Sequence, residues 1–249
     1  MGERGTVRRH PISTILLVVL ILALGTVGCA KKPKPEAEAK QADPAPAAEQ
    51  QRSTIKSPDP SIDRTGWPVI VAFGDSLTAG LGVPMEQNYP SQLQAELDER
   101  GYRYHVVNAG ISGDTTAGGL NRVESVLEHN PAIVILELGA NDGLQGKSTE
   151  QMEENLAQII ERLQKADVQV VLAGMHAPPN YGPEYTQSFH KVFEDLAKRY
   201  QLPFIPFILD QVGGVPELNL ADGIHPTAEG YTIVVNRNLL PVLETVLKK

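Results

Sequence analysis

The chain of 249 residues has one cysteine, few aromatic residues (5%) and only one long apolar run. A single cysteine excludes an intrachain disulfide and a cysteine-rich zinc site. The six histidines include no pair four residues apart and no HExxH pattern. The sequence therefore predicts neither a metal site nor a cofactor.

Basic residues are also scarce, with 22 Lys and Arg against 30 Asp and Glu and a formal net charge of −8. Binding to a nucleic-acid backbone depends on clustered positive charge, so no nucleic-acid partner is expected. A mean hydropathy of −0.18 excludes a protein that crosses a membrane many times. The 41% of hydrophobic residues is too high for wholesale disorder, and the length suits one ordinary domain.

Residues 1–29 have the pattern of an export signal. Arg4, Arg8 and Arg9 precede an uncharged apolar run over 12–30 that ends in small residues. The only cysteine, Cys29, follows Thr-Val-Gly. This resembles a bacterial lipobox and implies that Cys29 is lipidated and becomes the first mature residue. The alternative is an uncleaved transmembrane anchor, because the run is just long enough to span a bilayer of about 30 Å.

Both alternatives leave the arginines on the cytoplasmic side and the rest of the chain outside. We therefore expect an exported protein, anchored in a membrane through its N-terminus, that faces the periplasm or the cell exterior. Residues 30–64 are rich in Ala, Pro, Glu and Lys and lack apolar periodicity, which predicts a disordered linker. Residues 65–249 then form one domain.

Within that domain, short β-rich runs alternate with longer helical patterns. Strands are predicted at 68–73, 104–107, 133–138, 168–173 and 203–206, and helices at 89–100, 118–128, 149–166, 184–200 and 227–246. This alternation predicts an α/β fold with a parallel sheet and helices on both faces. Right-handed crossovers place the loops that follow the strands at one edge, where such proteins bind ligands.

Four glycine-containing polar blocks lie in those loops or at the matching edge. They are Gly74-Asp75-Ser76-Leu77, the segment 108–115, Gly139-Ala140-Asn141-Asp142 and Asp222-Gly223-Ile224-His225. Taken singly each block is weak evidence, because a serine in such a loop usually caps a helix and an Asn-Asp-Gly usually makes a turn. Their convergence at one edge favours a catalytic site.

These four blocks, in this order, resemble those of the SGNH or GDSL hydrolases, a family of serine esterases and lipases. The stretches closest to its bacterial periplasmic thioesterases, arylesterases and lysophospholipases are VNAGISGDTT, LELGANDGL and ADGIHPTAEGY. The resemblance covers 68–249. It implies a three-layer α/β/α, flavodoxin-like fold with a five-stranded parallel sheet.

The resemblance also implies a role for each matching residue. Ser76 is the expected nucleophile, His225 the base that takes its proton, and Asp222 the carboxylate that orients the imidazole. The expected oxyanion hole consists of the backbone N–H groups of Ser76 and Gly113 and the side-chain amide of Asn141. Each such donor typically contributes roughly 3–4 kcal/mol of transition-state stabilisation.

Other polar residues near the blocks have simpler interpretations. Asp75 and Asp114 are expected to fix loops through hydrogen bonds, and Asp142 to be a turn residue. The acyl group is expected in an open crevice bounded by 143–148 and 178–185, and His176 is a candidate for its lining.

The sequence thus predicts an extracytoplasmic serine esterase acting on short-to-medium acyl esters or thioesters, and lysophospholipids fit that location. Two alternatives stay open. One is a carbohydrate esterase that removes O-acetyl groups from polysaccharide or cell wall with the same triad. The other is a non-catalytic lipoprotein that binds the cell envelope. The oligomeric state is not predicted.

Overall fold

The computed structural model describes residues 55–249. The predicted export signal, the lipidation site at Cys29 and most of the predicted linker lie outside these residues. Within 55–249, no helix has the length and apolar character needed to cross a bilayer.

A five-stranded parallel sheet, in the order β2-β1-β3-β4-β5, forms the centre of the domain. The strands are β1 (Val69–Gly74), β2 (His105–Gly110), β3 (Pro131–Glu137), β4 (Gln169–Ala173) and β5 (Phe204–Ile205). This strand order is that of the flavodoxin-like α/β folds. The predicted fold class and all five strands are therefore confirmed.

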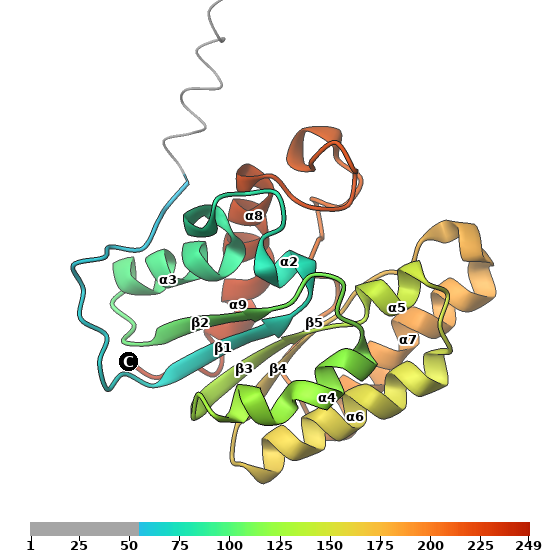
Figure 1. Cartoon of the computed structure of the whole chain (residues 1–249), viewed down its shortest axis with the longest axis horizontal. Helices are drawn as coiled ribbons and strands as arrows, with labels where there is room; N and C mark the ends of the chain where they lie inside the picture. Colours follow the sequence, from blue (N-terminus) through green and yellow to red (C-terminus); the bar gives the residue numbers. More distant parts are fainter. Residues whose placement is uncertain (1–54) are drawn as a thin grey trace, which may run out of the picture. The chain divides into compact units, whose positions relative to one another are not determined.

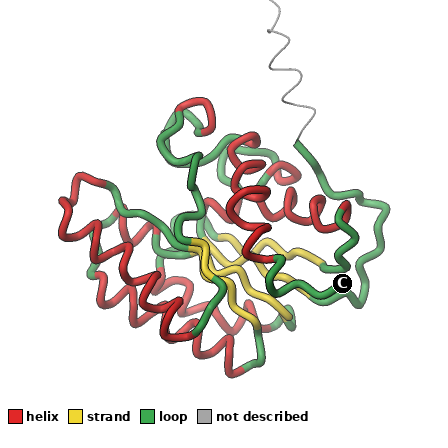
Figure 2. Tube along the Cα trace, turned by 180° about the vertical axis from the view of Figure 1, so that it is seen from behind, coloured by secondary structure: helices red, strands yellow, loops and turns green. Residues whose placement is uncertain are grey.

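Helices cover both faces of the sheet, as Figures 1 and 2 show. One face carries α3 (Tyr89–Glu99), α8 (Ala228–Ile233), η4 (Val234–Leu239) and α9 (Leu240–Leu243). The other carries α4 (Thr116–Leu127), α6 (Thr149–Lys165) and α7 (Gly182–Tyr200). The shorter elements are α2 (Ser76–Ala79), α5 (Ala140–Leu144), η1 (Met85–Gln87), η2 (Pro179–Tyr181) and η3 (Pro216–Leu218).

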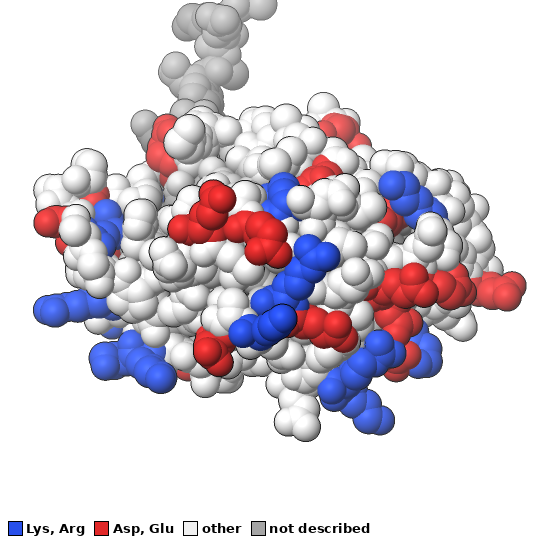
Figure 3. Space-filling view, turned by 60° about the horizontal axis from the view of Figure 1, so that its bottom comes forward, with Lys and Arg blue, Asp and Glu red and all other residues white. Residues whose placement is uncertain are grey.

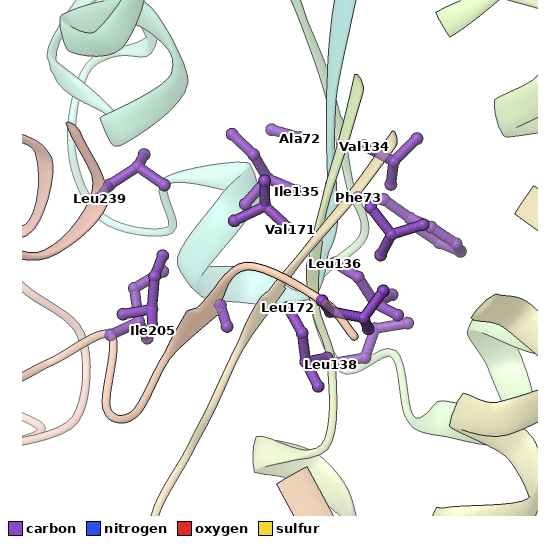
Figure 4. Packing of buried hydrophobic residues seen from close by; sticks show 14 of the residues in the cluster. Ala72, Phe73, Val134, Ile135, Leu136, Leu138, Val171, Leu172, Ile205 and Leu239 are labelled. Atoms are coloured by element: carbon purple, nitrogen blue, oxygen red, sulfur yellow. The ribbon is translucent and has the colours of Figure 1, made fainter. Parts of the chain in front are cut away.

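The central strands are apolar because both of their faces are buried. Successive side chains of β3 point to opposite faces, so Ile135 packs with Leu239 while Leu136 lies with Phe73 on the other side (Figure 4). All four side chains are fully buried. This double burial explains why the strand reads as a continuous apolar run rather than an alternating one.

Two elements differ from the sequence prediction. Strand β2 continues to Gly110, because its backbone stays paired with β1 up to the contact of Gly74 with Gly110. The last predicted helix is divided into three parts, with a wider turn at η4. Pro241 has no N–H to continue the regular ladder, and the N–H of Leu240 reaches back to the carbonyl of Val235 instead.

The predicted end of the linker at residue 64 is wrong. Residues 55–64 lie against α3, where Lys56 forms an ion pair with Glu96 at 2.7 Å and Arg64 forms one with Asp98. Both carboxylates are largely buried. The segment is attached to α3 through charged side chains and therefore has no apolar periodicity of its own. Its composition alone did not reveal the attachment.

Candidate active site

Ser76 lies at the sharp turn where β1 ends and the short helix α2 begins. Asp75 caps this helix, accepting a hydrogen bond from the backbone N–H of Leu77 at 3.0 Å. Gly110, at the end of β2, lies beneath the turn, and a Cβ atom there would be 2.2 Å from the backbone nitrogen of Ala79. A glycine is therefore needed for α2 to lie this close to the sheet.

His225 and Asp222 lie in a tight hairpin that precedes α8. The hairpin is closed by backbone hydrogen bonds from Leu220 to His225 at 2.8 Å and from Thr227 to Leu218 at 2.9 Å. The hydroxyl of Tyr231 in α8 donates to the carbonyl of Leu77 at 2.9 Å. This bond ties α8, and with it the hairpin, to the turn that carries Ser76.

The structure brings the hydroxyl of Ser76, the imidazole of His225 and the carboxylate of Asp222 into one line. Nε2 of His225 lies 2.8 Å from Oγ of Ser76, and Nδ1 lies 2.7 Å from Oδ2 of Asp222. With the Nδ1 hydrogen donated to Asp222, Nε2 is left to accept the hydrogen of Ser76. A proton can therefore pass from the hydroxyl to the imidazole without further movement.

Asp222 is held as a carboxylate by its own turn. Its Oδ1 accepts the backbone N–H groups of Ile224 at 2.9 Å and His225 at 3.0 Å. These backbone bonds, together with the imidazole of His225, lower the pKa of Asp222 to about 2. The carboxylate is thus charged throughout the pH range in which an imidazole titrates.

Two of the three predicted oxyanion donors are unengaged. Within residues 55–249, neither the backbone N–H of Ser76 nor that of Gly113 donates to a protein acceptor. Gly113 has a φ of +85°, and a Cβ atom there would meet nothing within 4 Å. The reason for glycine is therefore the left-handed backbone conformation and not a lack of space for a Cβ atom.

The third predicted donor, Asn141, is already engaged. Its amide donates to Oδ2 of Asp75 at 3.0 Å and to the carbonyl of Asp114 at 2.9 Å. Both hydrogens are thus used within the protein, and one bond must lengthen or be shared before the amide can bind an oxyanion. The role of Asn141 in the oxyanion hole stays a prediction.

A pair of buried carboxyl groups lies beneath the nucleophile turn. Asp75 and Glu137 are both fully buried. Oε2 of Glu137 accepts the hydroxyl of Thr78 at 2.7 Å, which leaves Tyr89 to donate its own hydroxyl to Thr78 at 3.0 Å. Oε1 of Glu137 has no hydrogen-bond partner among the described residues.

Burial shifts both of these acids toward the neutral form. It raises the pKa of Asp75 to about 6, although the bonds from Leu77 and Asn141 act against it. Burial, reinforced by the charge of Asp75, raises the pKa of Glu137 well above its usual value. Glu137 was missed by the sequence analysis because it ends an apolar strand, with no motif around it.

Arg122 of α4 is a second residue that the motifs did not reveal. Its guanidinium donates to Asp114 at 2.6 Å and to the carbonyls of Ala109 and Gly74 at 2.9 Å each. It also lies over the ring of Phe73. One side chain therefore joins the ends of β1 and β2 to the loop that carries Gly113.

The predicted loop-fixing hydrogen bonds of Asp75 and Asp114 are confirmed by these contacts. Asp142 is more than a turn residue, because its buried carboxylate accepts the backbone N–H and the hydroxyl of Thr116, both at 2.8 Å. It joins the start of α5 to the start of α4. This long-range link was not visible in the Asn-Asp-Gly pattern.

We call the row formed by Ser76, His225 and Asp222 the catalytic line. A cavity of about 280 Å³ adjoins it. Its lining includes Leu77 and Ile224, which follow Ser76 and precede His225, and also Leu144 and His176. The candidate position of His176 is thus confirmed; its ring stacks on Phe207 at 4.0 Å. Burial and the neighbouring His190 lower the pKa of His176, so the ring is neutral at pH 7.

The predicted crevice is correct on one side and incomplete on the other. The segments 143–148 and 178–185 contribute Leu144 and Pro178, but the opposite wall comes from Phe207, Leu209 and the neighbouring glycines. A larger hollow of about 840 Å³ lies at the other edge of the sheet, lined by Arg103, Gln169 and Lys248. None of the candidate catalytic residues lines it.

A serine, an imidazole and a carboxylate in this order, at the carboxyl edge of a doubly wound sheet, define the geometry of a serine hydrolase. The family model for the GDSL-like lipase/acylhydrolase family matches residues 72–233. The chain therefore belongs to this family, and it is a hydrolase of acyl esters.

Curated relatives and solved structures agree with this assignment. The chain is 41% identical over 179 residues to "Esterase TesA" of Pseudomonas aeruginosa, covering 72% of this chain and 89% of the relative. It is 35% identical over 168 residues to "Thioesterase 1/protease 1/lysophospholipase L1" of Escherichia coli, covering 67% and 79%. The crystal structure of TesA superposes with a TM-score of 0.69 at 41% identity, covering 72% of this chain and 99% of that one.

Replacing Arg122 by alanine is expected to lower the free energy of unfolding by about 3–5 kcal/mol, because it leaves the largely buried Asp114 without its partner. Arg162→Ala is the matched control on a neighbouring helix. Arg162 is 44% exposed, and its ion pair with the exposed Glu124 is long, at 3.7 Å. That change is expected to cost less than about 1 kcal/mol. Urea unfolding of both variants measures the difference, and equal losses would contradict the proposed anchoring role.

The raised pKa of Asp75 predicts a loss of stability as the pH rises. The unfolded chain releases this proton near 3.8 and the folded chain near 6, so the stabilisation is complete below pH 4 and is lost as the pH passes through 6. The shift corresponds to about 3 kcal/mol. In Asp75→Asn, the decline of unfolding free energy between pH 4 and 7 is expected to be shallower by about this amount. Parallel stability curves for the two proteins would contradict the assignment.

Proposed function

We propose that the protein is an extracytoplasmic serine esterase that cleaves carboxylic ester or thioester bonds through an acyl-enzyme. The observation that carries the proposal is the line of hydrogen bonds from Ser76 through His225 to Asp222. Ser76 is then the nucleophile, His225 the general base and acid, and Asp222 the group that orients and stabilises the imidazolium.

The reaction follows from this geometry in two halves. Oγ of Ser76 attacks the carbonyl carbon while its proton moves to Nε2 of His225, and the oxyanion forms beside the N–H groups of Ser76 and Gly113. His225 then returns the proton to the leaving alcohol or thiol. Water, deprotonated by His225, attacks the acyl-enzyme and releases the acid and the free Ser76.

The lining of the cavity beside the catalytic line favours a substrate with an acyl chain of short-to-medium length. Its walls are mainly apolar, with Leu77, Leu144, Met175 and Ile224 among the lining residues, which favours a hydrocarbon chain over a sugar. The names of the relatives include thioesterase, arylesterase and lysophospholipase. An extracytoplasmic site disfavours acyl-CoA, a cytoplasmic thioester, so lysophospholipids or acylated envelope compounds fit better.

Ser76→Ala is expected to abolish turnover of a short-chain aryl ester while leaving the fold intact, because the variant lacks the nucleophile. It is also expected to resist labelling by a fluorophosphonate that modifies the wild type. Asp222→Asn is expected to lower kcat roughly 10³–10⁴-fold, since the amide favours the wrong imidazole tautomer. Steady-state kinetics measure this, and full activity of Asp222→Asn would overturn the triad.

The proposed location rests on the basic head, the apolar run and Cys29. Mass spectrometry of the protein purified from membranes is expected to show a mature chain that begins at Cys29 and carries lipid. A chain that begins at an unmodified Met1 would refute the lipoprotein and leave the transmembrane anchor as the alternative.

A further inference from the structure

Six large apolar side chains are exposed within residues 55–249, and all six lie at one edge of the sheet. They are Leu81 (47% exposed), Met85 (80%), Ile111 (51%), Leu144 (43%), Tyr181 (40%) and Ile224 (42%). The first two follow β1, and the others follow β2, β3, β4 and β5 in turn. We call these six residues the apolar rim. Because the strands are parallel, every one of these loops lies at the edge that carries Ser76.

This clustering is not explained by the cavity alone. Leu144 and Ile224 line the cavity, but Met85, Ile111 and Tyr181 do not. Met85 is the most exposed of the six and forms part of η1, beyond the catalytic turn. Single exposed apolar residues are normal on a protein surface, whereas a one-sided set around a site indicates a partner with an apolar surface.

The opposite edge of the sheet has a different character. Charged residues of both signs lie there, before β2, β3 and β4 and at the C-terminus, and all are exposed: Arg103, Lys165, Lys248 and Lys249 with Glu128 and Asp167. On the lower side of the domain, basic and acidic side chains are interspersed (Figure 3). Because the chain has a formal net charge of −8, a strongly anionic surface would repel it. The apolar rim therefore suits a surface without net charge.

The described chain begins beside the rim. Ile55 and Ser57 line a hollow together with Val83 and Pro84, and the hydroxyl of Ser57 donates to the carbonyl of Glu86 at 3.2 Å. Glu86 is the neighbour of Met85. The 54 preceding residues, which include the apolar run, therefore join the domain at the edge that carries the site.

The length of the preceding segment allows the rim to reach the membrane. Residues 30–54 separate Cys29 from Ile55, and 25 residues span at most about 90 Å when fully extended. A short tether of this kind gives an effective concentration in the millimolar range. Even weak affinity of the rim for lipid then keeps the domain at the surface.

We propose that the apolar rim is a lipid-docking face, on which the domain lies against the zwitterionic bilayer that holds its own N-terminus. In this arrangement the Ser76 site opens toward the membrane, and a single-chain lipid enters the cavity from the bilayer surface. The inference rests on the proposed function, since it places that site against the source of its substrate.

The test uses the full chain reconstituted into phosphatidylcholine vesicles that contain a lipid-borne fluorescence quencher. Met85→Cys is labelled with a polarity-sensitive fluorophore, and Arg103→Cys at the opposite edge is the matched control. The wild-type protein, labelled in the same way, gives the background signal from the native Cys29. The label at position 85 is expected to shift to the blue and to be quenched several-fold more than the label at 103.

Equal quenching at both positions, stronger quenching at 103, or no quenching at either position would each overturn the docking face. The same samples are assayed with a soluble short-chain ester, which measures the proposed function separately. Inactive protein with preferential quenching at 85 would reject the esterase and keep the docking face. Active protein without preferential quenching at 85 would keep the esterase and reject the docking face.

A second variant tests the consequence for catalysis. Met85→Ser removes the most exposed side chain of the rim, which does not line the cavity. Hydrolysis of the soluble ester is expected to stay at the wild-type rate, and hydrolysis of lysophosphatidylcholine in vesicles to fall several-fold. Unchanged rates on both substrates would contradict the proposal.

Discussion

One hydrogen bond, from Ser76 to His225, joins two segments that are 149 residues apart in sequence. It forms because two larger constraints meet. The parallel sheet places the end of β1 between the ends of β2 and β3, and the bond from Tyr231 to Leu77 fixes α8 against the catalytic turn. Local structure alone does not determine the position of either Ser76 or His225. The reactive geometry is thus a property of the packed domain.

The support beneath the nucleophile is made of groups that are costly to bury. Asp75 and Glu137 lie in the core without a cation of their own, and burial keeps them toward the neutral form. Arg122 instead compensates the charge of Asp114 and donates to two backbone carbonyls, those of Ala109 and Gly74, at the edge. Such networks define one arrangement of the loops, because any other leaves a polar group unpaired. The burial of Asp75 and Glu137 therefore does not favour stability at neutral pH, although these two groups help to hold the site in place.

Much of the fold was predictable because it depends on local patterns. Continuous apolar runs identify buried strands such as β3, and apolar spacing identifies helices such as α6. The catalytic line was reachable only through motifs, since nothing in the composition places His225 beside Ser76. Arg122, Glu137 and the cavity wall at Phe207 were missed, because each acts through contacts distant in sequence. The attachment of residues 55–64 was missed for the same reason.

The hairpin that carries both Asp222 and His225 has a consequence for inactivation. It is held by a few backbone bonds and by Tyr231, and its tip at 221–224 is exposed, whereas the sheet is buried on both faces. Segments with few buried contacts open at a lower free energy than the core. Heating should therefore inactivate the enzyme by opening this hairpin while the sheet is still folded. Cooling should then restore the activity without any refolding of the sheet.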